Sequence, residues 1–576
     1  MRRRLASLVV GCGILGVGGM VWYWNRPTAT VPPAGLHGYD DPTRHALPAG
    51  DGAGRVAFLD QGWTPRDATD FYFHTQGSRL LPYDWFLALE QTASTALFHE
   101  SGHLAGFGYL PQRPSRANPD GLPVGFARDP ERTGEFAGWV GFTCAACHTS
   151  ELHHAATAYR IDGGPGGGDL QAFLAALSAA LRTTLDDQPR FDRFATRLGV
   201  GDRADLRRRL GEEVRHRERY EDQNRTPHPH GPARLDAFGR IVNTVLTDAV
   251  GVSDAENIRP PDAPVSYPFL WDTPHHDRVQ WNGVARNTVR GSDRVGGLAR
   301  NVGEVLGVFG RVTVSEPGTA STLTGYRSSA RVPDLLHLEE LLRKLQSPQW
   351  PADFPPLAEE KVHAGAELFA RHCAGCHADI DRSDPSRAVT AVLTPVRQVG
   401  TDPRMAANFA GRSGRTGRLE GRRTYFSAGD RFGPTARADD VIVHVVVGVI
   451  LGSPWKNYQN VGLTLLRDQP LVAAAGDDPL LVYKARPLNG VWATAPFLHN
   501  GSVPTLFDLL RPPAGRPVEF RVGSRRFDPV RVGFESAAWS FRFDTRLPGN
   551  ANTGHEYGTT LTDDQRWQLV EYLKSI

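Results

Sequence analysis

Two copies of the pentapeptide Cys-x-x-Cys-His constrain this chain more than any other feature of its sequence. Their cysteines and histidines are Cys144, Cys147 and His148, and Cys373, Cys376 and His377. In such a segment the two thiols reach the two vinyl groups of one haem, and the adjacent imidazole faces the iron. The sequence therefore predicts two covalently bound c-type haems, with His148 and His377 as iron ligands.

Other chemistries of Cys-x-x-Cys pairs fit less well. Two pairs can build a four-cysteine zinc ribbon, and a single pair can act as a redox dithiol. Zinc ribbons separate their pairs by roughly 15–20 residues, far fewer than lie between positions 147 and 373. Neither alternative explains a histidine after each pair. The fifth cysteine, Cys12, lies near the N-terminus, so none remains for a disulfide.

Residues 1–24 begin with Met1 and three arginines and continue as a mostly apolar run. This pattern predicts a membrane anchor whose basic end stays inside the cell. A cleaved signal peptide and a lipoprotein signal ending at Cys12 are alternatives, but the apolar run exceeds the roughly 7 to 15 residues of a signal core. We expect a periplasmic protein, membrane-tethered at the inner membrane through an N-terminal transmembrane helix.

Length and composition limit the remaining choices. A chain of 576 residues is too long for one hydrophobic core, so two large domains are expected. Lys and Arg number 65 against 63 Asp and Glu, and the net charge of +2 gives no field that would favour nucleic acid as a partner. The 61 glycines and 43 prolines predict long irregular connections.

The predicted fold is mainly α, with two cytochrome-c-like haem domains, long irregular loops and few short strands, plus the N-terminal anchor. Helical patterns span 170–198, 203–220 and 357–369, and a capping box at 562–565 begins a C-terminal helix that should pack across the helix before the second motif. The expected divisions are an anchor or signal segment at 1–24, a periplasmic linker at 25–80, an N-terminal haem domain at 81–346, a Pro-rich linker at 347–356, and a C-terminal cytochrome-c-like haem domain at 357–576.

The sixth iron ligand decides whether a haem carries electrons or performs catalysis. Met405 is the only thioether outside the N-terminal segment, so at most one haem has His/Met ligation. His499 lies in a loop bounded by Pro and Gly that could hold its side chain rigidly, although a lone histidine is more often merely hydrogen-bonded.

The segment around His499 resembles the bacterial di-haem cytochrome c peroxidase superfamily and, more narrowly, the rubber-oxygenase-like di-haem cytochromes c. The residues that carry the resemblance are KARP at 484–487, TAP at 494–496, HNGS at 499–502 and TL at 505–506, with further similarity at 81–86, 118–123, 267–271, 280–283 and 299–304. The resemblance implies that His377 and His499 ligate the second iron. It also implies that His148 alone holds the first, whose far side is open to a small oxidant.

By the same resemblance, the pocket of the first haem draws on Trp281, Asn282 and the segment 300–309. Within that segment Arg300 or Glu304 could polarise or deprotonate a bound peroxide. The alternative is a core helix whose buried face is formed by Val302, Val305, Leu306 and Phe309.

These features together predict a haem oxidoreductase in which the first haem activates peroxide or dioxygen and the second relays electrons. A dioxygenase that cleaves an organic substrate, as rubber oxygenases do, is one alternative, and a non-enzymatic electron-transfer module is another. The expected redox partner is a small electron-transfer protein or a membrane oxidoreductase. A Ca²⁺ ion between the domains is compatible with the sequence but cannot be derived from it.

Overall fold

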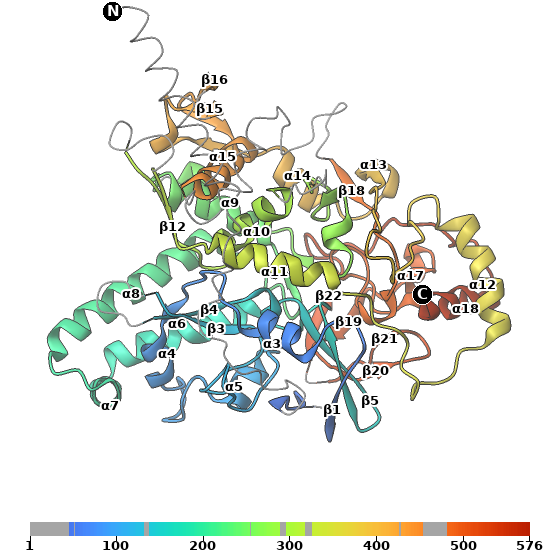
Figure 1. The fold of residues 1–576 in the computed structure, drawn as a ribbon, viewed down its shortest axis with the longest axis horizontal. Helices are drawn as coiled ribbons and strands as arrows, with labels where there is room; N and C mark the ends of the chain where they lie inside the picture. Colours follow the sequence, from blue (N-terminus) through green and yellow to red (C-terminus); the bar gives the residue numbers. More distant parts are fainter. Residues whose placement is uncertain are drawn as a thin grey trace, which may run out of the picture.

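The structure is a computed structural model that describes residues 45–576 except 51, 132–137, 254, 288–294, 317–324, 426–427, 453–480 and 539. The described chain is elongated, with one group of helices at each end (Figure 1). One end holds α6 (Leu170–Asp186), α7 (Gln188–Leu198) and α8 (Arg203–Gln223), and the other holds α12 (Glu359–His372) and α18 (Asp563–Ser575).

The membrane anchor predicted for residues 1–24 falls outside the described residues. Within the described ranges, no helix combines the length and the apolar character that crossing a bilayer requires. The predictions of a transmembrane helix, a membrane tether and an inner-membrane location rest on hydropathy alone. The described residues do not support them, because they contain no helix that could cross a bilayer.

Two three-stranded sheets flank the first Cys-x-x-Cys-His segment. One has the order β2-β4-β3 and the other the order β1-β6-β5, with β1 parallel to β6. All residues of β4 and β6 are buried, as aromatic and β-branched sequences favour. The strands are β1 (Arg55–Phe58), β2 (Leu81–Pro82), β3 (Phe126–Asp129), β4 (Trp139–Phe142), β5 (Thr149–His154) and β6 (Thr157–Asp162). The motif is therefore the connection from one sheet to the other.

Aspartates begin each helix of the α6–α8 group. Asp169, Asp187 and Asp202 each accept a hydrogen bond from the backbone N–H three residues further on. Because Asp187 starts a new helix and Pro189 occupies its first turn, the predicted helix over 170–198 is two helices.

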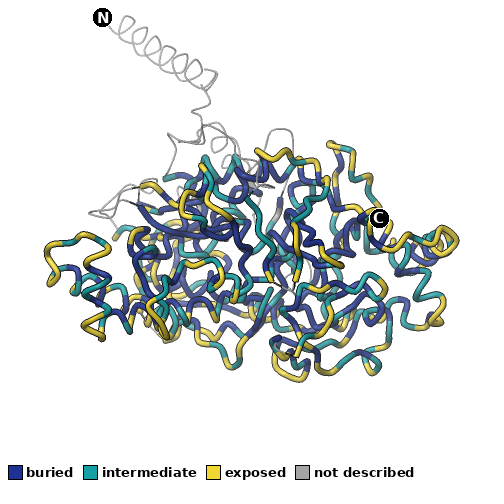
Figure 2. The backbone as a smooth tube through the Cα atoms, turned by 90° about the horizontal axis from the view of Figure 1, so that it is seen from below, coloured by how far each residue is buried: buried dark blue, intermediate teal, exposed yellow. Residues whose placement is uncertain are grey.

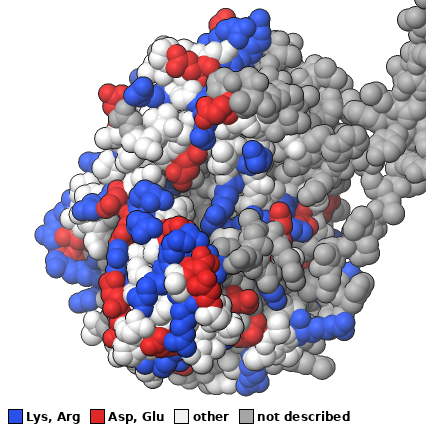
Figure 3. All heavy atoms as spheres, turned by 90° about the vertical axis from the view of Figure 1, so that its left-hand side faces the viewer, with Lys and Arg blue, Asp and Glu red and all other residues white. Residues whose placement is uncertain are grey.

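The surface of this end carries charges of both signs side by side (Figure 3). On α8, for example, Arg208 forms ion pairs with both Asp205 and Glu212. Exposed pairs of this kind add little stability but keep the helix soluble.

A layer of helices lies above these two sheets in Figure 1. Its members are α9 (Ala237–Thr244), α10 (Val295–Gly307), α11 (Val332–Lys344) and α15 (Ala438–Leu451). Helix α10 contacts the other three, and its residues Val302, Val305 and Leu306 are buried in their shared core. The apolar face of α10 is thus a core face, as the alternative interpretation of 300–309 expects for these three residues, whereas Phe309 follows the helix and packs, partly buried, against another cluster.

Helices α12 and α18 pack against each other, which confirms the predicted contact between them. The predicted capping box is present, because Thr562 and Gln565 satisfy each other's backbone N–H groups. The two helices approach closely at Gly365, where a Cβ would lie 2.1 Å from the carbonyl oxygen of Gln568.

Short strand pairs occupy many of the connections that were predicted to be irregular. The chain is 38% helix and 17% strand, so a mainly α fold with few strands is wrong. The pairs are β7 (Arg234–Leu235) with β8 (Val265–Ser266), β9 (Arg278–Val279) with β10 (Ala285–Arg286), β11 (Val312–Val314) with β12 (Tyr326–Ser328), β13 (Leu393–Pro395) with β18 (Val482–Lys484), β14 (Ser413–Arg415) with β17 (Thr435–Arg437), β15 (Arg423–Tyr425) with β16 (Ala428–Arg431), β19 (Glu519–Val522) with β22 (Phe541–Asp544), and β20 (Phe527–Asp528) with β21 (Gly533–Phe534). Strands of two to four residues leave no periodicity to recognise, and one pair, β13 with β18, joins segments that are distant in sequence.

The remaining helices are short. They are α3 (Pro65–Phe73), α4 (Tyr83–Ala88), α5 (Ser101–Gly106), α13 (Val396–Val399), α14 (Arg404–Ala410) and α17 (Leu506–Leu509), with single turns at η1 (Cys144–Ala146), η2 (Val245–Ala249), η3 (Ala255–Asn257), η4 (Thr273–His275), η5 (Gly417–Leu419), η6 (Val491–Ala493) and η7 (Pro513–Gly515).

Buried backbone runs through the middle of the molecule, and exposed segments gather at its two ends (Figure 2). The main hydrophobic cluster includes Phe71, Trp271, Trp492 and Leu569, so it draws on both sides of the Pro-rich run at 347–356. The domain boundary at that run stays a prediction.

Candidate haem sites

The first motif is a single helical turn, η1, that follows β4. Thr143 fixes the turn, because its hydroxyl accepts a hydrogen bond from the backbone N–H of Ala145 and lies 3.1 Å from the carbonyl oxygen of Tyr72. Gly125 packs against the turn so closely that a Cβ there would lie 2.1 Å from the nitrogen of Ala146. The backbone that carries the two cysteines is therefore tightly held.

Both cysteine thiols of this motif point toward polar partners. The Sγ atom of Cys144 donates to Oε1 of Gln76 at 3.2 Å, and Cys147 shares a hydrogen bond with Tyr267. Burial raises the pKa of each thiol to about 12. None of the four cysteines in the described ranges forms a disulfide, so all are available for thioether bonds.

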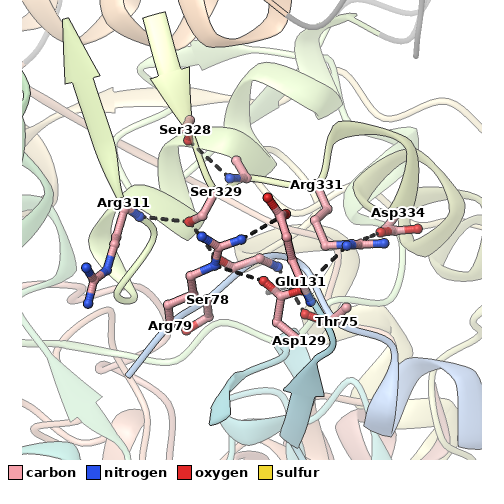
Figure 4. A network of polar contacts seen from close by, with 12 residues as sticks. Thr75, Ser78, Arg79, Asp129, Glu131, Arg311, Ser328, Ser329, Arg331 and Asp334 are labelled. Atoms are coloured by element: carbon pink, nitrogen blue, oxygen red, sulfur yellow. Dashed lines mark hydrogen bonds and ion pairs between the residues drawn. The ribbon is translucent and has the colours of Figure 1, made fainter. Parts of the chain in front are cut away.

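The polar network drawn in Figure 4 fixes the position of the segment that carries Gln76. Nε of Arg79 donates to Asp129 at 3.0 Å, and the same guanidinium pairs with Glu131 at 2.8 Å. The hydroxyl of Ser329 donates to the carbonyl of Gly77 at 2.7 Å. The network joins β3 to the chain just before α11, and it holds Gln76 against the first motif.

The imidazole of His148 has the orientation and protonation that an iron ligand needs. Its Nδ1 donates to the carbonyl oxygen of Pro268 at 2.8 Å, which leaves Nε2 free to bind a metal. Burial lowers the pKa of His148 to about 4, so the ring is neutral at physiological pH.

The second motif repeats this arrangement at the end of α12. Nδ1 of His377 donates to the carbonyl oxygen of Arg486 at 2.6 Å, and burial lowers the pKa of this imidazole. Cys373 follows the last residue of α12, and burial raises the pKa of its thiol to about 11.

A cavity of about 220 Å³ opens beside the second motif. Cys373, Cys376 and His377 line it together with apolar side chains, among them Val399, Leu488, Val491, Phe497, Leu506, Leu509, Leu510 and Leu573. Two thiols, an oriented imidazole and an apolar wall are the groups that a covalently attached haem requires. The residues present therefore fit haem c.

Two further histidines line this cavity, His499 and His555. The ring centre of His555 lies 6.3 Å from that of His377, and Nδ1 of His555 is buried without a hydrogen-bond partner. His555 is therefore a second imidazole close to the histidine of this motif, in the cavity that would hold the haem.

His499, the predicted sixth ligand, stacks instead on Tyr483, with ring centres 4.2 Å apart. Burial lowers the pKa of His499 to about 3, so its ring is neutral too. Its role as ligand stays a prediction. Met405 is buried in α14 beside Tyr483 and does not line the cavity.

The four residues predicted for the pocket of the first haem separate into two groups. Arg300 and Glu304, on α10, lie close enough to Cys144 for their charges to shift its pKa in opposite directions. Trp281 lines the cavity of the second motif, where its indole N–H donates to the carbonyl of Ser266 at 3.1 Å. Asn282 is buried, and its Nδ2 has no hydrogen-bond partner in the described part of the chain.

Arg300 and Glu304 have different surroundings. Arg300 forms an ion pair with the buried Glu339. Glu304 accepts a hydrogen bond from Gln280 at 2.6 Å, and burial raises the pKa of its carboxyl group. Both line a second, largely apolar cavity of about 100 Å³, with Phe238, Ile241, Val284, Phe409 and Ile442 among its walls.

Several contacts at these sites have no sequence signal. The carbonyl acceptors on Pro268 and Arg486 lie 120 and 109 residues from the histidines that they orient. His555 is one of 20 histidines in the chain and is separated from the second motif by most of the C-terminal half. For Ca²⁺, the described residues contain no group of three or more His, Cys, Asp or Glu side chains arranged to hold a metal ion.

Comparison with known families agrees with this geometry. Residues 482–521, which contain Arg486 and His499, match the family described as RoxA-like, cytochrome c-like. The chain therefore has a rubber-oxygenase-like cytochrome c domain, which implies covalently bound haem c and a haem-containing oxidoreductase. The wider resemblance to the di-haem peroxidase superfamily stays a prediction.

At the level of the whole chain, the protein belongs to the same family as the uncharacterized protein y4iJ of Sinorhizobium fredii. The two are 31% identical over 592 residues, which cover 91% of this chain and 93% of that protein. The uncharacterized protein y4iM of the same organism is 22% identical over 374 residues, covering 60% of this chain and 72% of that protein.

Proposed function

We propose that the chain is a di-haem oxidoreductase in which the His148 haem meets a small oxidant, preferably peroxide, and the His377 haem exchanges electrons with it. The supporting observation is the difference between the two histidines. His377 has a second imidazole, His555, whose ring centre lies 6.3 Å from its own. In the described part of the chain, the only ring contact of His148 is with Tyr267, at 6.3 Å.

Bound haem supplies an iron that carries single electrons and, where one axial position is free, binds a small oxidant. Reducing one peroxide to two waters consumes two electrons and two protons, and two haems can store the two electrons. A small electron-transfer protein is the proposed donor.

The residues near Cys144 can supply the protons that peroxide reduction consumes. Burial raises the pKa of Glu304, so this carboxyl holds a proton to higher pH than an exposed glutamate does, and Gln280 fixes its orientation. Arg300, which also pairs with Glu339, lies beside it and is suited to polarising an oxygen–oxygen bond. Glu304 is the proposed proton donor.

Electron paramagnetic resonance of the oxidised holoprotein tests the difference in ligation, with equal amounts of high-spin and low-spin iron expected. Peroxide-dependent oxidation of a reduced small cytochrome tests the reaction. Glu304→Gln should slow it about 100-fold or more, whereas Glu360→Gln, on the exposed face of α12, should leave it unchanged. Two low-spin irons and no peroxide consumption would indicate an electron carrier instead.

Oxygen-dependent cleavage of an organic substrate is the second candidate. It is favoured by the RoxA-like match and by the apolar walls of the cavity beside Arg300 and Glu304. Incubation with polyisoprene and dioxygen distinguishes this reaction from peroxide reduction, because cleavage would yield carbonyl-ended oligomers without any added peroxide.

A further inference from the structure

Two buried basic side chains, Lys484 and Arg486, lie side by side at the end of β18, and neither forms an ion pair with an acidic residue in the described part of the chain. Lys484 is 8% exposed, and its Nζ donates to the backbone carbonyl of Arg278 at 3.0 Å. Arg486 is 7% exposed, and its Nη2 donates to the carbonyl of Phe269 at 2.6 Å and to the hydroxyl of Thr273 at 3.3 Å. The Nε of Arg486 has no partner among the described residues.

The surrounding residues add positive charge and unused hydrogen-bond groups, and they do not neutralise the charges of Lys484 and Arg486. His276 is fully buried, and both of its ring nitrogens lack partners in the described ranges. Arg300 is near enough to lower the pKa of Lys484, but its own charge is matched by Glu339. An ammonium group has three N–H donors, and only one of those on Lys484 is used.

The acidic groups within reach are already engaged. Asp272 pairs with Arg387 at 2.6 Å and also accepts a hydrogen bond from Asn489 at 2.6 Å. Asp277 accepts the backbone N–H of Ala391 at 2.9 Å. Because an unpaired buried charge is strongly destabilising, an anion from outside this set would stabilise the charged forms of Lys484 and Arg486.

Both side chains line the cavity that contains Cys373, Cys376 and His377. Arg486 is also close enough to the first motif for its charge to lower the pKa of His148. The two cations therefore lie between the two attachment sites, on the wall of the second.

We propose that Lys484 and Arg486 form a buried carboxylate-binding site, and that its ligand is the propionate carboxylates of the haem attached at Cys373 and Cys376. The inference rests on the proposed di-haem function and extends it. An ammonium group and a guanidinium group can pair with a carboxylate through charge-assisted hydrogen bonds. The site would thus hold the anionic edge of the haem and set the charge around its iron.

The test uses the full-length holoprotein. Intact mass first establishes that both haems are attached, and spectroelectrochemical titration then gives the two reduction potentials. Lys484→Gln should favour the oxidised form of the second haem about tenfold, which is about 59 mV lower for a one-electron couple, because the propionates lose a cation. Lys484→Arg, which keeps the charge, should retain most of the original potential, and the exposed α12 variant Lys361→Gln should leave it unchanged.

Two outcomes would overturn the proposal. One is an unchanged potential in Lys484→Gln while both haems remain attached. The other is a saturable shift of the wild-type potential on addition of acetate that Lys484→Gln abolishes, since the site would then take a free acid. If Lys484→Gln does not fold, Lys484→Arg and Arg486→Lys, which keep the positive charge, are used in its place. A lowered reduction potential of the second haem in both of these variants would then be the result that contradicts the proposal. A mass without two haems would instead count against the proposed function.

Discussion

Arg486 and Phe269 connect the histidines of the two Cys-x-x-Cys-His motifs. The guanidinium of Arg486 donates to the carbonyl of Phe269 at 2.6 Å, and the preceding residue, Pro268, accepts the hydrogen bond from His148. The carbonyl of Arg486 itself accepts the hydrogen bond from His377. One pair of residues thus helps to orient both imidazoles, which gives the two sites a common structural support.

His555 and His499 should differ in their effect on the second iron. The ring of His555 lies 6.3 Å from that of His377, so we expect His555 to supply the second imidazole, and His555→Ala should convert the low-spin iron to high-spin. His499→Ala should leave the spin state unchanged, since this ring stacks on Tyr483. Electron paramagnetic resonance of the two oxidised variants decides between them, and the reverse pattern would restore His499 as the ligand.

Removal of Asp129 should destabilise the first site. Asp129 is fully buried beside Arg79, so Asp129→Ala leaves a buried guanidinium without its main partner and should cost about 3–5 kcal/mol in the free energy of unfolding. Glu131→Ala removes the second, 55% exposed partner of the same arginine and should cost less than about 1 kcal/mol. Urea denaturation of the two variants measures the difference, and equal losses would show that burial does not decide the strength of this pair.

The crossing of α12 and α18 should tolerate no side chain at Gly365. In Gly365→Ala the new Cβ would meet the carbonyl of Gln568, so the helices must separate, at a cost of about 1–3 kcal/mol. Gly375→Ala is the control, because nothing lies within 4 Å of its Cβ and the change turns the second motif into the C-A-A-C-H of the first. Thermal unfolding followed at the haem absorbance compares them. A Gly365→Ala protein as stable as the Gly375→Ala protein would contradict the close packing.

Glu151 should make the free energy of unfolding depend on pH at values below the usual titration range of a glutamate. Burial opposes ionisation of this carboxyl, but the charge of Arg160 and the hydrogen bond with His153 outweigh it and lower the pKa from 4.5 to about 2. The ionised group therefore stabilises the native state fully above pH 4.5, on the order of 3 kcal/mol, and this contribution is lost as pH falls toward 2. The stability difference between wild type and Glu151→Gln in urea should narrow between pH 5 and pH 3. A constant difference would show that the pKa is not lowered.

The sequence predicts the local features of this protein and one long-range helix contact, but not its long-range strand pairing and hydrogen bonds. Both attachment motifs, the capping box at Thr562 and the contact of the first and last helices of the C-terminal half follow from short patterns with a direct physical cause. The pairing of β13 with β18, which joins Leu393 to Lys484, follows from no such pattern. The carbonyls that orient His148 and His377 are likewise determined by folding over more than 100 residues.

The intact mass of protein produced in cells with a working haem-attachment system tests the central claim most directly. The expected mass is that of the polypeptide plus two haems, falling to one haem when Cys144 and Cys147 are replaced by serine and to one when Cys373 and Cys376 are replaced. A colourless protein with the mass of the bare polypeptide would contradict it.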